Sequence, residues 1–168
     1  PVGRYSTLTA TDSTFDMYSD SFRERAEVIA KAIGELCGGC ERFLAVGLGN
    51  YALTSDAVGP LTAEKIFATR HIKSLAKEID TDDLGEVTVI QTGVLGNTGI
   101  ESSEQVKAIA ERVTPQAVIA VDALACSELT NLGRTIQLCN TGISPGSGIE
   151  NARKELSLST LGVKCIAI

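Results

Sequence analysis

The sequence has few aromatic side chains and lacks a long apolar run. Aromatic residues make up 4% of the 168 residues and tryptophan is absent, so base-stacking surfaces for nucleic acid are poorly supplied. No apolar run approaches the ~20 residues that a membrane-spanning helix needs. The N-terminal stretch PVGRYSTLTATD lacks the apolar core of a signal peptide. We therefore expect a cytoplasmic protein without a membrane partner.

Basic residues are also few. The chain has 15 Lys and Arg residues against 21 Asp and Glu residues, a formal net charge of −6. No basic stripe interrupts this acidity, and a phosphate backbone would be repelled by it. Direct binding of nucleic acid is therefore not expected.

Histidine is almost missing. His71 is the only one, which excludes a histidine-rich metal site and means that any Ser–His–Asp or Cys–His mechanism must use it. We expect His71 at the C-terminus of a helix, where a cationic side chain favours the helix dipole.

The five cysteines are odd in number and scattered, which predicts free thiols in a reducing compartment. Cys37 and Cys40 have C-x-x-C spacing, but no second pair completes a zinc site and no thioredoxin-like strand precedes them. The end of a helix explains the two intervening glycines, so a redox or metal role is less favoured. The remaining three are interpreted as core thiols: Cys126, Cys139 and Cys165.

Apolar runs alternate with amphipathic segments along the chain. Helices are expected over 21–37, from about Pro60 through Phe67, and from about Thr98 through Val113; the first and third have capping-box spacing. Strands are expected over 43–46, 87–90, 117–121, 135–139 and 163–168. This alternation predicts a three-layer α/β/α fold with a mostly parallel central sheet.

We expect residues 1–168 to form a single domain. The last strand stops at Ile168 without a polar tail, whereas chain termini are usually frayed at the surface. The domain is therefore expected to be the front part of a longer chain.

Two aspartates follow expected strands. Asp56 lies in the loop after the strand over 43–46, and Asp122 directly follows the apolar run over 117–121. In an open α/β sheet, ligands bind beyond the carboxyl ends of the strands. Two carboxylates that converge there repel each other, so one acid and one base can coexist. Such a pair could activate a water and protonate a leaving amine.

Both aspartates also have a purely structural interpretation. Asp56 precedes the helix expected near Pro60, and Asp is a favoured N-cap; on residue type alone, that role is the better supported one. For Asp122, a cap or ion pair is about as well supported as catalysis, although burying a carboxylate after an apolar strand costs desolvation.

Glycine-rich loops flank the expected strand ends. The loop with Gly47, Gly49 and Asn50 starts like a dinucleotide fingerprint but lacks the third glycine, so a tight turn beside a site is the preferred interpretation. The loop with Gly146 and Gly148 could hold an anion, contact substrate or simply lie at the surface. We assign these five residues to substrate binding.

Taken together, several stretches resemble the germination proteases of spore-forming bacteria. They are PVGRYSTLTA, VGLGNYALTSDAVGPLTAEKIFATRHI, VIQTGVLGNTGIESSEQVKAIAERVTPQAVIAVDALA, TIQLCNTGISPGSGIENARKELS and TLGVKCIAI. The resemblance implies an endopeptidase that degrades small acid-soluble spore proteins during germination. It also implies a zymogen, a homotetramer, a location in the spore core or forespore, and catalysis by two aspartates without a cofactor or metal. By motif these are Asp56 and Asp122.

Two other functions are kept as alternatives. The hydrogenase-maturing endopeptidases share a glycine–x–glycine–asparagine loop and a strand-ending aspartate, which implies a related fold, similar to that of phosphorylases, and a metal site. His71 is poorly placed as a third ligand for such a site. A non-enzymatic module that binds a nucleotide or another anion through its glycine loops is the third possibility.

Overall fold

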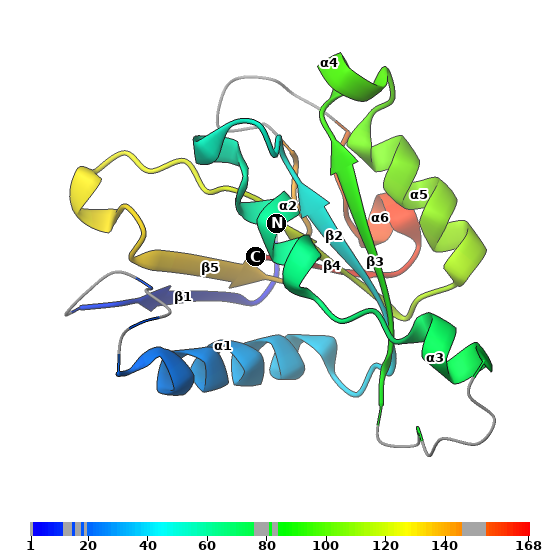
Figure 1. Cartoon of the computed structure of the whole chain (residues 1–168), viewed down its shortest axis with the longest axis horizontal. Coiled ribbons are helices and arrows are strands. Elements are labelled where there is room, and N and C mark those ends of the chain that lie inside the picture. The colour runs from blue at the N-terminus through cyan, green and yellow to red at the C-terminus, as the bar shows by residue number, and fades with distance from the viewer. Residues whose placement is uncertain are drawn as a thin grey trace.

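The computed structural model describes residues 2–11, 15, 18, 20–75, 81, 84–145 and 154–168. Within these residues the chain forms a six-stranded sheet with the order β1-β5-β6-β4-β2-β3 (Figure 1). The strands are β1 (Tyr5–Thr9), β2 (Arg42–Leu48), β3 (Glu86–Gly93), β4 (Ala117–Val121), β5 (Thr135–Cys139) and β6 (Lys164–Ala167). All five strands expected from the sequence are therefore confirmed.

The centre of the sheet is parallel. β2 pairs in parallel with β3 on one side and with β4 on the other, and β4 pairs in parallel with β6. Four of the five residues of β4 are buried, and from Leu44 onward β2 is buried throughout. Strands covered on both faces need a nearly continuous apolar sequence, which explains why these two runs show no polar alternation.

Helices cover both faces of the sheet (Figure 1). They are α1 (Phe22–Cys37), α2 (Val58–Lys65), α3 (Arg70–Leu75), α4 (Leu95–Thr98), α5 (Ser102–Val113) and α6 (Leu158–Leu161). Val106 of α5 packs in one core cluster with Leu44 and Val118. Leu36 of α1 packs in a second cluster with Ile166. Because the side chains of a strand alternate between faces, the two clusters lie on opposite faces. The predicted three-layer fold is confirmed.

The antiparallel side of the sheet was not predicted. β1 is an edge strand that pairs antiparallel with β5, from Tyr5 opposite Cys139 to Thr9 opposite Thr135. β5 in turn meets β6 antiparallel. The residues of β1 alternate between exposed and half-buried, as expected for an edge strand with one solvated face. That alternation was present in the sequence YSTLT, but the polar character of the segment concealed it.

Both expected capping boxes are wrong. Ser21 is the N-cap of α1, yet its side chain makes no capping hydrogen bond. The N-cap of α5 is Glu101, three residues beyond Thr98, which ends the short helix α4 instead. The Thr98 hydroxyl accepts a hydrogen bond from the backbone N–H of Ile100 (3.2 Å) and so serves the turn between the two helices.

The predicted position of His71 at the end of a helix is also wrong. α2 ends at Lys65, and His71 is the second residue of the separate helix α3. The buried Thr69 fixes this break: its hydroxyl donates to the carbonyl of Gly85 (2.5 Å) and accepts from the N–H of Val87 (2.9 Å). α3 therefore begins beside the amino end of β3. None of the described helices is both long and apolar enough to cross a membrane.

Candidate active site

The carboxyl ends of β2 and β4 lie side by side. Gly47 of β2 pairs with Val121 of β4 near the end of both strands. Asp122 directly follows Val121, and Asp56 lies in the loop that follows β2. The two strands are therefore neighbours, as the convergence of the two carboxylates requires, and the parallel pairing brings both segments to one edge of the sheet.

Asp56 closes the loop in which it lies. It is the last residue of a 3₁₀ turn (Thr54–Asp56). The N–H of Asn50 donates hydrogen bonds both to the backbone carbonyl of Asp56 (3.0 Å) and to the side-chain Oδ2 of Asp56 (2.9 Å). Oδ1 has no hydrogen-bond partner among the described residues, and the side chain is half-buried. One carboxylate oxygen is thus used by the fold, and the other remains for a ligand.

The N-cap interpretation of Asp56 is wrong. α2 begins at Val58, its N-cap is Ala57, and no side chain caps it. The carboxylate bonds backward to Asn50 rather than forward into α2. A loop closure of this kind holds the aspartate at a fixed position relative to the end of β2.

Asp122 extends the sheet by one residue. The N–H of Asp122 donates to the carbonyl of Ile168 (3.0 Å), and the N–H of Ile168 donates to the carbonyl of Ala120 (2.9 Å). Its Oδ1 accepts from the N–H of Ala123 (2.9 Å), and the residue is half-buried. The backbone of Asp122 is therefore held by an extension of the β4–β6 ladder, and its side chain bonds to the next residue of the chain.

Gly59 fastens α2 to this edge, a role that the sequence analysis missed. A Cβ atom at residue 59 would meet the carbonyl oxygens of Leu48 and Val121, and would lie 2.6 Å from the backbone N of Leu48. All three are backbone atoms of β2 and β4, so they cannot rotate out of the way. The loop with Asp56 is thereby held close to the strand that leads to Asp122. A helix-breaking residue inside a helical segment was the available sequence signal.

The first glycine loop shows close backbone packing. A Cβ at Gly47 would meet the Gly59 carbonyl and lie 2.9 Å from the Ala63 Cβ, and one at Gly49, whose φ is 110°, would meet the carbonyl oxygen of Asp56. The Asn50 side chain accepts a hydrogen bond from the N–H of Ala52 (3.0 Å). These contacts fit the preferred interpretation of a tight turn beside a site. Gly146 and Gly148 lie outside the described residues.

No third metal ligand joins the two aspartates in the described part of the chain, where no group of three or more His, Cys, Asp and Glu residues is found. His71 lies in α3, beside the amino end of β3, whereas both aspartates follow the carboxyl ends of their strands. It is therefore remote from the candidate site along the strand direction.

The cysteines only partly match the prediction of core thiols. Cys165 is buried, and burial, aided by Cys139 and Glu155, raises the pKa of its thiol to about 12. Cys139 is half-buried. Cys126 is exposed, which contradicts the prediction, because the chain leaves the sheet after Asp122; its Sγ donates to the carbonyl of Glu128 (2.7 Å).

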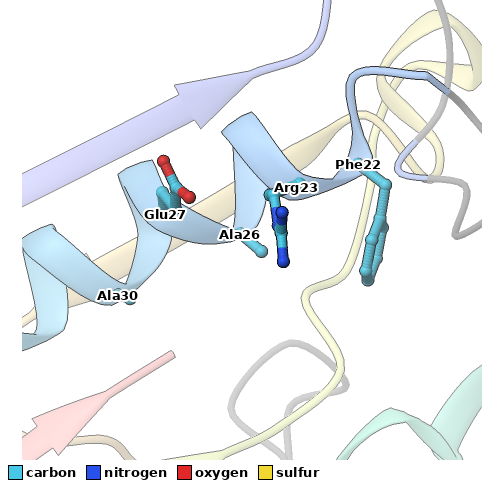
Figure 2. A pocket seen from close by; sticks show the side chains of 5 residues that line it. All are labelled: Phe22, Arg23, Ala26, Glu27 and Ala30. Carbon is cyan, nitrogen blue, oxygen red and sulfur yellow. The ribbon is translucent and has the colours of Figure 1, made fainter.

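Two surface hollows lie away from the aspartates. Figure 2 shows the first, of about 380 Å³, which is lined by side chains of the single helix α1: Phe22, Arg23, Ala26, Glu27 and Ala30. The second, of about 560 Å³, lies between β3 and α5 and includes Ile90, Gln91 and Glu104. A strip on one helix is not an enclosed cleft, so the first offers no site for chemistry.

Comparison with known proteins points to one family. The germination protease family model matches residues 3–168. Germination proteases from Clostridium perfringens strain SM101 and Caldanaerobacter subterraneus are 40% and 43% identical to the chain; each alignment covers 100% of this chain and 52% of the relative. The one from Halalkalibacterium halodurans is 49% identical, over 99% of this chain and 46% of the relative. The chain thus spans about half the length of these relatives.

A solved structure shows a weaker similarity. The NiFe hydrogenase maturation protease HycI from Thermococcus kodakarensis is 19% identical, with a TM-score of 0.46, over 81% of this chain and 77% of that one. A similarity at this level carries no argument about function.

Proposed function

Because the chain belongs to the germination protease family, we propose that it carries the catalytic centre of an endopeptidase that acts on small acid-soluble spore proteins during germination. Asp56 and Asp122 are the proposed catalytic residues. The observation that carries the proposal is the parallel pairing of β2 with β4, which delivers both aspartates to one edge of the sheet. The substrate class comes from the family resemblance.

The two carboxylates would share the work of amide hydrolysis. One, as the base, takes a proton from a water molecule that attacks the peptide carbonyl, and the other, as the acid, gives a proton to the leaving amine. Asp56 keeps Oδ1 available while Oδ2 is held by Asn50. The backbone of Asp122 is held at the end of β4.

The proposal is tested by replacing each carboxylate with its amide in the intact protein. Asp56→Asn and Asp122→Asn should each lower the cleavage rate of a small acid-soluble spore protein by about 10²–10⁴-fold, the range for loss of a positioned acid or base. Asp20→Asn, the same change at an exposed position before α1, is the matched control and should cleave normally. Cleavage is followed by gel electrophoresis and mass spectrometry.

Folding must be checked in the same samples. Urea unfolding curves of the three variants should lie close to that of the unmodified protein, so that lost activity cannot be attributed to lost structure. Full activity of a folded Asp56→Asn or Asp122→Asn variant would remove that aspartate from the mechanism. Activity that disappears with a chelator and returns with a divalent metal would favour a metallopeptidase instead.

Three further properties follow from the same resemblance. We propose a homotetramer, synthesis as a zymogen, and a location in the cytoplasm of the forespore and the spore core. Sedimentation velocity of the purified intact protein tests the tetramer directly. A monomer at all concentrations would contradict it without touching the assignment of the two aspartates.

A further inference from the structure

The segment between Cys37 and Cys40 folds back on itself more sharply than the end of a helix requires. Cys37 is the last residue of α1, and Gly38, with a φ of 59°, is the C-cap of this helix. The N–H of Gly38 donates a hydrogen bond to the carbonyl oxygen of Gly34 (3.0 Å). One left-handed residue completes such a cap. Gly39 nevertheless also has a positive φ, of 76°. The cap interpretation therefore accounts for the first glycine but not for the second.

Two successive residues with positive φ are the pattern of a type I′ turn. Such a turn brings the Cα atoms of its first and fourth residues, here Cys37 and Cys40, within about 7 Å of each other. A disulfide joins cysteines whose Cα atoms are about 4.4–6.8 Å apart. Two positive φ values fit this turn, and the contact of the Cys40 Sγ with the Cys37 carbonyl oxygen shows that the two cysteines lie side by side.

Side-chain contacts hold the Cys40 sulfur against Cys37. The Cys40 Sγ donates to the carbonyl oxygen of Cys37 at 2.9 Å. The Lys164 ammonium group, at the start of β6, lies 3.1 Å from the same carbonyl and 3.9 Å from the Cys40 Sγ. The positive charge of Lys164 thus lies beside the Cys40 sulfur, where it attracts an anionic oxidant.

The two thiols differ in exposure, which assigns them different roles. Cys37 is only 5% exposed, whereas Cys40 is half-buried and open to attack from solvent. Burial is the main cause that raises the pKa of the Cys37 thiol; Cys40 raises it further, and Lys164 opposes both. Cys40 is therefore the thiol that an external oxidant meets first, and Cys37 is the second.

We propose that Cys37 and Cys40 form a redox-modification site that takes a low-molecular-weight disulfide as its oxidant. The Cys40 thiolate attacks one sulfur of the disulfide, forms a mixed disulfide and releases the first thiolate. Cys37 then loses its proton and attacks the Cys40 Sγ, which expels the second thiolate and leaves a Cys37–Cys40 bond. The protein loses two electrons and two protons, and the oxidant becomes two thiols.

The test uses the intact protein and oxidised glutathione as the probe. After incubation, free thiols are blocked with N-ethylmaleimide and the peptides are mapped by mass spectrometry. We expect an intramolecular Cys37–Cys40 disulfide that dithiothreitol reverses. In Cys37→Ser the second step is missing, so glutathione should remain on Cys40. In Cys40→Ser, Cys37 should stay reduced, and Lys164→Gln should react several-fold more slowly.

Cys126→Ser is the matched control, since it removes an exposed cysteine outside the turn and should leave formation of the bridge unchanged. Far-UV circular dichroism of each variant confirms that it is folded. The proposal is overturned if the unmodified protein keeps both Cys37 and Cys40 reduced under conditions that modify Cys126. It is also overturned if glutathione stays on Cys40 while Cys37 remains a free thiol. Neither readout depends on peptidase activity.

Discussion

Replacing Gly59 by alanine should damage both the stability and the candidate site of this protein. Gly59 lies in the first turn of α2, where a Cβ would press against Leu48 and Val121. Ordinary carbon contacts have their optimum near ~3.5–4.0 Å, and the backbone N of Leu48 would lie at 2.6 Å. Because every opposing atom belongs to the sheet backbone, α2 has to move away by about 1 Å.

The expected cost can be set from this geometry. Overpacking of a well-packed interior costs about 1–3 kcal/mol. The upper end, about 3 kcal/mol, applies here because no side chain can relax. The displaced helix would carry the Asp56 loop with it. Since a misplacement of about 1 Å can cost ~10²-fold in rate, we expect the cleavage rate to fall by about that factor even in the folded fraction.

Gly34 provides a matched control for this substitution. It lies inside α1, and a Cβ there would meet no atom within 4 Å. Gly34→Ala should therefore stabilise the protein by about 0.5–1 kcal/mol, because alanine loses less backbone entropy in a helix. The same chemical change thus has opposite signs at the two positions. Urea unfolding followed by circular dichroism measures both, and a Gly59→Ala variant at least as stable as the unmodified protein would refute the reasoning.

Two further predictions concern stability alone. Thr114 has a φ of 48° at the C-cap of α5, so Thr114→Gly should stabilise by about 1 kcal/mol, since a β-branched residue is strained there; an unchanged urea midpoint would contradict this. The Cys165 thiol keeps its proton up to a pKa of about 12, against an ordinary value of 9.0. The contribution of this thiol to the free energy of unfolding is fully present below pH ~9. Above that pH the thiol ionises only in the unfolded chain, so the free energy of unfolding should fall by about 1.4 kcal/mol per pH unit. The free energy of unfolding, measured by urea at several alkaline pH values, should therefore fall less steeply with pH for Cys165→Ala than for the unmodified protein. Equal slopes would exclude the effect.

The parallel core could be predicted from the sequence because its strands are buried on both faces. The runs over 43–46 and 117–121 are apolar without interruption, and a short uninterrupted run fits few other structures. The breaks between helices were harder to predict. Residues 66–69 leave the helix because Thr69 bonds to Gly85 and Val87, partners that are distant in sequence. A pattern read along one segment cannot contain them.

In the candidate site, too, only the features that depend on neighbouring residues could be predicted from the sequence. The position of Asp122 at the end of a strand follows from the apolar run before it. The role of Asp56 could not be decided locally, because on residue type alone an aspartate shortly before an expected helix is better explained as part of its N-terminal cap. Only the hydrogen bond from Asn50 across the loop settles that it does not cap α2. Gly59 was overlooked since its contacts are with backbone atoms of two other elements.

The two ends of the sheet are held by different kinds of contact, and this predicts where substitutions should matter. At the amino ends of the strands, Thr69, Cys40 and Lys164 join helices to strands through hydrogen bonds to backbone carbonyls or amides. At the carboxyl ends, close backbone packing at Gly59 leaves little side-chain volume above Leu48 and Val121. We therefore expect a substitution at Gly59 to disturb the segments of both aspartates together, whereas a substitution at Thr69 should disturb only the join between α3 and β3.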